Sequence, residues 1–185
     1  MDESLRSYTR IRLTALERPE DKPTTELLIE LGRSRKKELN IFRVLSVNYD
    51  LLVRFSDLGA QLSSGTLSSR LREAAILRTA ALCNSAYEWE QHLARARASG
   101  LEGDEIVAIA NSSPFEWGER EAAVLGATSE LVGEGELSDG TWAQLQLHFN
   151  DQELVELVVL VSFYISVARI VGGLAIPLEK SVYQT

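Results

Sequence analysis

Glu73 has the residue type and the surroundings that acid/base chemistry requires. It lies on an apolar helical stripe, since residues three, four and seven positions further on are Ile76, Leu77 and Ala80. Burial on such a stripe raises the pKa of a carboxyl group into the range useful for proton transfer. An exposed glutamate near a helix start, favoured there by the helix dipole, explains the same pattern equally well.

His92 is one of two histidines in the chain and shares a predicted helical face with Ser85 and Glu88. A histidine that faces a carboxylate is the usual oriented general base. The alternative is a partly buried histidine held by Glu88 in an i, i+4 pair. The other histidine, His148, lies near a predicted helix end that favours positive charge, and we interpret it as structural.

The neighbours of His92 supply further candidates. Tyr87 and Glu88 are expected to orient or hydrogen-bond a substrate, with Trp89 as a pocket wall, although core or interface roles are the alternative for both aromatic residues. Either Arg72 or Arg78 is a candidate to hold a substrate carboxylate. The predicted catalytic residues are therefore Glu73, His92, Tyr87 and Glu88, and the predicted substrate-binding residues are Trp89, Ser85, Cys83 and Arg72.

Helical periodicity dominates the sequence, and no alternating run indicates a strand, so we predict an all-α fold. Residues 1–23 are predicted to form an extended arm, and 24–185 a single helical domain. A helix from Ser68 or Ser69 to Leu82 would carry Glu73. Ser85-Ala-Tyr-Glu88 matches a capping box at the start of the next predicted helix, and this helix would carry His92. Other helices are predicted from Thr24 or Thr25, Asn40 and Asp50, and over 104–110, 118–132, 142–149 and 150–172.

The predicted helices also suggest an internal duplication. Arg72-Glu-Ala-Ala-Ile-Leu77 reappears as Arg120-Glu-Ala-Ala-Val-Leu125, and Glu105-Ile-Val-Ala-Ile109 as Glu153-Leu-Val-Glu-Leu157, both shifted by 48 positions. Chance likeness between amphipathic helices is the alternative. A third match, of Trp89-Glu-Gln-His92 with Trp142-Ala-Gln-Leu145, is shifted by 53 positions and puts Leu145 in place of the histidine, so only the first copy could carry histidine chemistry.

Composition limits the functional classes. The net charge of −8 argues against a nucleic-acid partner, and the apolar 157–168 stretch is too short to span a bilayer, so it is predicted to be a buried helix. The N-terminus shows no apolar signal-peptide core. The single cysteine rules out an internal disulfide framework and fits a reducing cytoplasm. One cysteine and two histidines argue against a dedicated zinc or haem site, and no cofactor motif is present. We expect no metal, cofactor or membrane partner.

Several runs together resemble the carboxymuconolactone decarboxylase and alkyl hydroperoxidase D-like family. They are Leu67-Ser-Ser-Arg-Leu-Arg-Glu73, Tyr87-Glu-Trp-Glu-Gln-His92 and Gly100-Leu-Glu-Gly-Asp-Glu-Ile106. The resemblance implies a helical-hairpin core, assembly as a trimer or hexamer, and roles for Glu73 and His92. The hydroperoxidase-type cysteine pair would fall at Ser85 and Glu88, so both thiols are absent and Cys83 is out of register.

The resemblance therefore favours a cofactor-free acid/base lyase that acts on a small lactone or keto carboxylic acid. The ending Tyr164-Ile-Ser-Val-Ala168 departs from the decarboxylase pattern and leaves the substrate open. Two alternatives remain: a non-catalytic oligomeric protein that binds a small ligand, and a residual peroxide-related activity. Retained activity in Cys83→Ser would remove the last of these.

Overall fold

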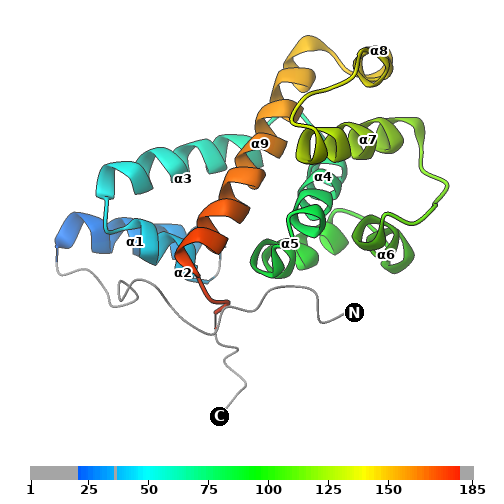
Figure 1. Ribbon diagram of the computed structural model, residues 1–185. Coiled ribbons are helices and arrows are strands. Elements are labelled where there is room, and N and C mark those ends of the chain that lie inside the picture. Colours follow the sequence, from blue (N-terminus) through cyan, green and yellow to red (C-terminus); the bar gives the residue numbers. More distant parts are fainter. Residues whose placement is uncertain (1–20, 36, 180–185) are drawn as a thin grey trace. The chain divides into compact units, whose positions relative to one another are not determined.

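The computed structural model describes residues 21–35 and 37–179 (Figure 1). Within these residues the protein is helical and contains no strand, which confirms the predicted all-α class. The helices are α1 (Lys22–Arg35), α2 (Asn40–Leu45), α3 (Tyr49–Ser63), α4 (Ser69–Leu82), α5 (Ala86–Ala98), α6 (Gly103–Asn111), α7 (Glu119–Gly133), α8 (Asp139–His148) and α9 (Asp151–Leu174). The chain divides into two compact units: Ser64–Ile170, and a second that includes 21–63 and 171–179. Residues 1–20 of the predicted arm lie outside the described residues.

The unit Ser64–Ile170 is built around α4, which packs against α5, α6 and α7 (Figure 1). Alanines make this close packing possible, because Ala74, Ala75 and Ala80 are fully buried and keep the neighbouring helices near the α4 backbone. The core cluster of α4 to α7 and the loops between them comprises Ala74, Leu77, Ala80, Trp89, Ala96, Leu101, Ile106, Ile109 and Leu125.

Two arginines of α4 tie it to its neighbours. Arg70 forms ion pairs with Glu105 of α6 and, at 3.1 Å, with Glu121 of α7. Arg78 donates to the Ile109 carbonyl at 3.0 Å, near the C-terminus of α6, where a positive charge is favoured. These contacts fix α4 and with it the position of Glu73.

The second unit is held together around α2. Ile41, Phe42, Val44 and Leu45 of this short helix are buried. The backbone N–H of Asn40 donates to Glu179 at 2.7 Å, and its side-chain amide donates to the Pro177 carbonyl at 3.1 Å. The segment after α9 is thereby joined to the start of α2.

Several helix starts agree with the sequence predictions. Ser68 caps α4 and accepts a hydrogen bond from the Leu71 N–H at 3.3 Å. Asn150 and Glu153 form the predicted reciprocal cap of α9, since each side chain accepts from the other's backbone N–H at 3.0 Å. These caps satisfy N–H groups that have no partner within the helix.

Other boundaries differ from the predictions. α1 begins at Lys22 rather than Thr24, because the Asp21 carboxylate accepts from the Thr24 N–H at 2.9 Å and acts as the cap. α8 begins at Asp139 rather than Trp142, since Ser138 caps it by accepting from the Thr141 N–H. α9 continues through Gly172 and Gly173 to Leu174.

By length and composition alone, α9 could cross a membrane. Its Leu154, Leu157, Leu160 and Val161 are nevertheless buried inside the protein. The Glu156 carboxylate accepts hydrogen bonds from the backbone N–H groups of Thr66 and Leu67, at 2.6 and 3.1 Å. These contacts pack part of α9 into its own fold, whereas Val155 and Val159 of the same helix are exposed, so the predicted burial holds for one face only.

The helix order is consistent with the proposed duplication. The first set of matched segments falls on α4 and α6, and the second set on α7 and α9. Leu145 of α8 is the residue that the proposed second copy has in place of the histidine, and it is 0% exposed. In the proposed second copy, a buried apolar residue thus stands at the position that His92 takes in the first.

Candidate functional site

Glu73 and His92 meet in the interior of the Ser64–Ile170 unit. Oε2 of Glu73 lies 2.8 Å from Nδ1 of His92, and the two residues are only 5% and 7% exposed. A neutral imidazole that donates from Nδ1 to a carboxylate has its lone pair on Nε2. The pair is therefore a carboxylate-oriented imidazole, the arrangement of a general base.

Packing of α4 against α5 produces this contact. The two helices form a hairpin through Cys83, Asn84 and Ser85, and Asn84 adopts a left-handed φ of 54° that reverses the chain. The Ser85 N–H donates to the Ala80 carbonyl at 2.8 Å and closes the end of α4. Of the two interpretations of Glu73, the structure selects the buried one.

Glu88 lies one helical turn before His92 on α5 and is 2% exposed. Neither of its carboxyl oxygens has a hydrogen-bond partner among the described residues. Burial raises the pKa of Glu88 to about 8, while the nearby Ser85 hydroxyl lowers it by a smaller amount. At neutral pH this group is a protonated carboxylic acid that can donate a hydrogen bond or a proton.

The predicted capping box at Ser85 and Glu88 is only half formed, which corrects the sequence prediction. The Ser85 hydroxyl accepts from the Glu88 N–H at 3.5 Å, a long hydrogen bond. The reciprocal bond is missing, since the Ser85 N–H is already bound to the Ala80 carbonyl. The Glu88 carboxyl is thus released from a local structural role.

Sequence reasoning gave no role to two residues of α9 that lie at this site. The ring of Tyr164 meets the imidazole of His92 edge-on, with 5.0 Å between the ring centroids. Arg169, which is exposed, acts electrostatically on the thiol of Cys83. Arg169 could have been noticed in the sequence, because it is the one charged residue between Leu157 and Leu174.

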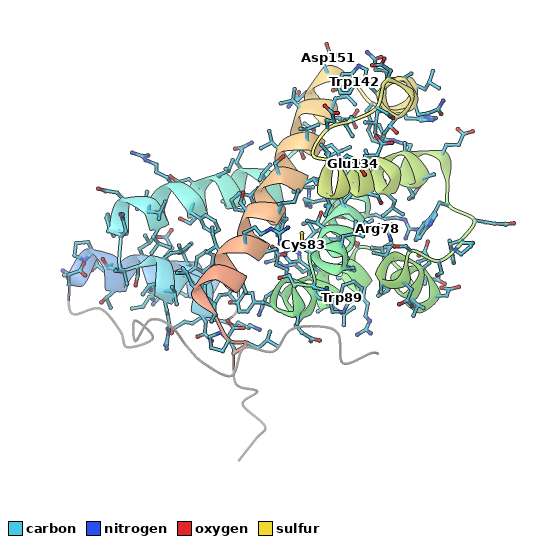
Figure 2. All side chains as sticks on the ribbon, in the orientation of Figure 1. Arg78, Cys83, Trp89, Glu134, Trp142 and Asp151 are labelled. Carbon is cyan, nitrogen blue, oxygen red and sulfur yellow. The ribbon has the colours of Figure 1, made fainter. Side chains whose placement is uncertain are left out.

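Cys83 lies half-buried at the C-terminal end of α4, where Figure 2 labels its sulfur. Burial raises the pKa of its thiol, the positive charge of Arg169 opposes this rise, and the carboxyl group of Glu88 adds to it. Cys83 therefore lies within electrostatic reach of both Arg169 and Glu88.

The remaining predicted residues have other surroundings. Trp89 lies in the hydrophobic core cluster, and Tyr87 is also buried. Arg72 donates to the Leu67 carbonyl at 3.1 Å and acts electrostatically on Glu156, while Arg78 holds the end of α6. The structure thus joins Glu73 to His92 and sets Glu88 and Ser85 on the same buried face, whereas Arg72 and Arg78 make structural contacts.

Among the described residues, no group of three histidine, cysteine, aspartate or glutamate side chains is arranged to hold a metal ion. The chemistry that the side chains themselves offer is proton transfer. His92 supplies a nitrogen base oriented by Glu73, and Glu88 supplies a neutral acid.

Residues 49–130 match the carboxymuconolactone decarboxylase family, a segment that contains Glu73, Glu88 and His92. No curated protein sequence matches the chain. Solved structures share its fold. An alkylhydroperoxidase AhpD core protein from Ralstonia eutropha JMP134, an uncharacterized peroxidase-related protein, is 18% identical with a TM-score of 0.78, over 92% of this chain and 93% of that one.

Two further structures extend the comparison. A protein of unknown function from Agrobacterium tumefaciens, named as a candidate antioxidant defence protein AhpD, is 20% identical with a TM-score of 0.69, over 75% of this chain and 97% of that one. The debrominase Bmp8, as a cysteine-to-alanine variant in complex with 2,3,4-tribromopyrrole, is 14% identical with a TM-score of 0.74, over 94% of each chain. At these identities the structures establish the fold, and the family match confirms the resemblance seen in the sequence. Residues 49–130 are therefore similar in sequence to the carboxymuconolactone decarboxylase family, and the helices adopt the alkyl hydroperoxidase D-like fold.

Proposed function

We propose that this protein is a cofactor-independent acid/base enzyme that acts on a small lactone or keto carboxylic acid. The observation that carries the proposal is the buried hydrogen bond between Glu73 and His92, one helical turn from the unpartnered Glu88 carboxyl group. The match to a family named for a lactone decarboxylase supports the choice of reaction.

In the proposed reaction the substrate carboxylate leaves as CO₂, and the electron pair of the broken C–C bond passes to the adjacent conjugated carbonyl. The resulting enolate oxygen accepts a hydrogen bond from protonated Glu88, which stabilises the developing charge. Protonated His92, oriented by Glu73, then delivers one proton to carbon and regains it from solvent. The balance is one carboxylate and one proton converted to CO₂ and a C–H bond.

A ligand-binding role without turnover is the second candidate. The deep burial of Glu73 and His92 supports it, because a buried carboxylate and imidazole that satisfy each other also form a stable core contact. A peroxide-related activity would depend on Cys83, the only thiol in the chain.

The test is turnover of a panel of small lactone and keto carboxylic acids, followed by ultraviolet absorbance and CO₂ release. The wild type is compared with His92→Ala, and His148→Ala serves as the matched histidine control. Turnover that His92→Ala abolishes and His148→Ala retains supports the proposal. Absence of turnover throughout the panel would favour the ligand-binding role. Full activity in Cys83→Ser would exclude a thiol mechanism.

A further inference from the structure

Arg169 carries a positive charge that no described structural contact uses. It is exposed on α9 in a stretch that is otherwise uncharged, and no ion pair of the described residues includes it. Arg70 and Arg120, by contrast, are paired with carboxylates, and Arg72 donates to a backbone carbonyl. Among the described residues, Arg169 is thus a cation of this unit that is available to a ligand.

Arg169 of α9 and Glu88 of α5 both act electrostatically on Cys83, at the end of α4. The Cys83 thiol is half-buried. Asn84, with its φ of 54°, turns the chain sharply between Cys83 and α5, and brings the thiol toward the start of that helix. The cluster therefore has an exposed cation at one side and a buried carboxyl group at the other.

The buried side of the cluster is suited to an anion. Glu88 is 2% exposed, and neither carboxyl oxygen has a hydrogen-bond partner among the described side chains. A protonated carboxyl group carries no charge and therefore does not repel an anion bound beside it. An arginine attracts the same anion from the solvent side and forms charge-assisted hydrogen bonds with carboxylate oxygens.

We propose that Arg169 of α9 binds the carboxylate group of a small anionic substrate beside Cys83, at the turn between α4 and α5. This inference rests on the proposed function, which requires a carboxylate-bearing substrate, and it assigns the anion-binding residue to α9 instead of to Arg72 or Arg78. Arg169 is a specificity-determining residue here, while proton transfer remains with His92, which Glu73 orients, and the hydrogen bond to the enolate remains with Glu88.

Cys83 provides a test that needs no turnover, because it is the only cysteine of the chain. Iodoacetate and iodoacetamide alkylate a thiolate by the same displacement of iodide and are similar in size, but only iodoacetate is an anion. The measured quantity is the ratio of their two rate constants at Cys83, relative to the same ratio for glutathione. Any effect of a variant on the thiol pKa acts on both reagents equally and cancels in this ratio.

The wild type is expected to favour iodoacetate by about three- to tenfold over the glutathione ratio, the size of effect that one nearby, partly solvated charge produces. Arg169→Met is expected to abolish this preference and Arg169→Lys to retain most of it. Arg97→Met, which removes an exposed arginine near the far end of α5, is the control and is expected to leave the ratio unchanged.

Two results would overturn the inference: a ratio that Arg169→Met leaves at the wild-type value, or a Cys83 that reacts with neither reagent in the native protein. Far-ultraviolet circular dichroism and thermal melting verify that Arg169→Met is folded, as expected for an exposed side chain. If the ratio depends on Arg169 and the lactone and keto acid panel shows no turnover, the anion site stands and only the enzymatic proposal fails. If turnover is found and the ratio does not depend on Arg169, the enzymatic proposal stands and only the anion site fails.

Discussion

Nδ1 of His92 lies 2.8 Å from Oε2 of Glu73, although the two residues are 19 positions apart in the chain. The contact joins the first half of α4 to the middle of α5, and both side chains are almost fully buried. An imidazole held in this way has a fixed ring orientation and one free nitrogen. The geometry therefore assigns separate tasks: Glu73 orients, and His92 exchanges the proton.

His92→Ala is expected to lower kcat for any substrate found in the panel by ~10²–10⁴-fold, the usual contribution of a positioned general acid or base. Glu73→Gln keeps the size of the side chain. It should also lower kcat, but by a smaller factor than His92→Ala does, with KM little changed. Steady-state kinetics measure both effects. His148→Ala, which alters the other histidine, should retain wild-type kcat, and a fully active His92→Ala would rule out the assigned role.

Glu88→Gln is expected to stabilise the protein at neutral pH. The ordinary pKa of 4.5 applies to Glu88 in the unfolded chain, whereas the folded value is about 8, so the unfolded state binds fewer protons between these values. The stability of the wild type therefore falls as pH rises from about 4.5 to about 8, relative to the neutral variant. The difference should reach the order of a few kcal/mol above pH 8.

Urea unfolding of wild type and Glu88→Gln at pH 5, 7 and 8.5 measures this difference. The other titratable or charged groups of the site are present in both proteins: Cys83, Glu73, His92, Tyr164 and Arg169. Of these, Cys83 is affected by the charge of Glu88, and its pKa is raised above the ordinary 9.0, outside the tested range. A stability difference that does not change between pH 5 and 8.5 would contradict the raised pKa of Glu88.

Gly65→Ala is expected to destabilise the protein by about 1–3 kcal/mol. A Cβ atom at this position would overlap the Glu156 carboxylate, which must then leave the N–H groups of Thr66 and Leu67. Gly126→Ala is the matched control, because it lies within α7 with no atom within 4 Å of the added Cβ, and should stabilise the helix by about 0.5–1 kcal/mol. Thermal unfolding compares the two variants, and equal changes would refute the role of Glu156.

Arg70→Met is expected to lower the stability of the fold at neutral pH and to have little effect at acidic pH. The hydrogen bond from Arg70 is the main cause of the lowered pKa of Glu105. A lowered pKa contributes stability that is present above the ordinary value of 4.5 and is lost as pH falls through the folded value. The contribution is about 1 kcal/mol, since the pair is partly solvated.

Denaturant unfolding at pH 7 and pH 3 measures this effect. Arg70→Met should be less stable than wild type at pH 7, and the difference should shrink at pH 3. Arg97→Met, whose arginine is exposed, should show neither change. A constant difference between Arg70→Met and wild type at the two pH values would show that Glu105 does not depend on Arg70.

Local sequence determined most of the helices, because caps and apolar periodicity act within a few residues. Ser68 and Asn150 begin helices as predicted, and the hairpin of α4 and α5 has nearly the predicted bounds. Which of several neighbouring residues caps a helix was harder to predict from the sequence. Asp21 took the place of Thr24, since the capping residue is decided by which side chain reaches the free N–H groups.

The sequence by itself also marked Glu73, Glu88 and His92 as polar residues on apolar faces, a local property of helical spacing. Only the tertiary structure decided which of them are joined. The Ala80 carbonyl binds the Ser85 N–H and leaves Glu88 without its capping partner, while α4 brings Glu73 to His92. α9 adds Tyr164 and Arg169 from more than 70 positions away. Contacts over such separations depend on how whole helices pack, and the pattern within one helix carries no information about the side chains that a neighbouring helix will place against it.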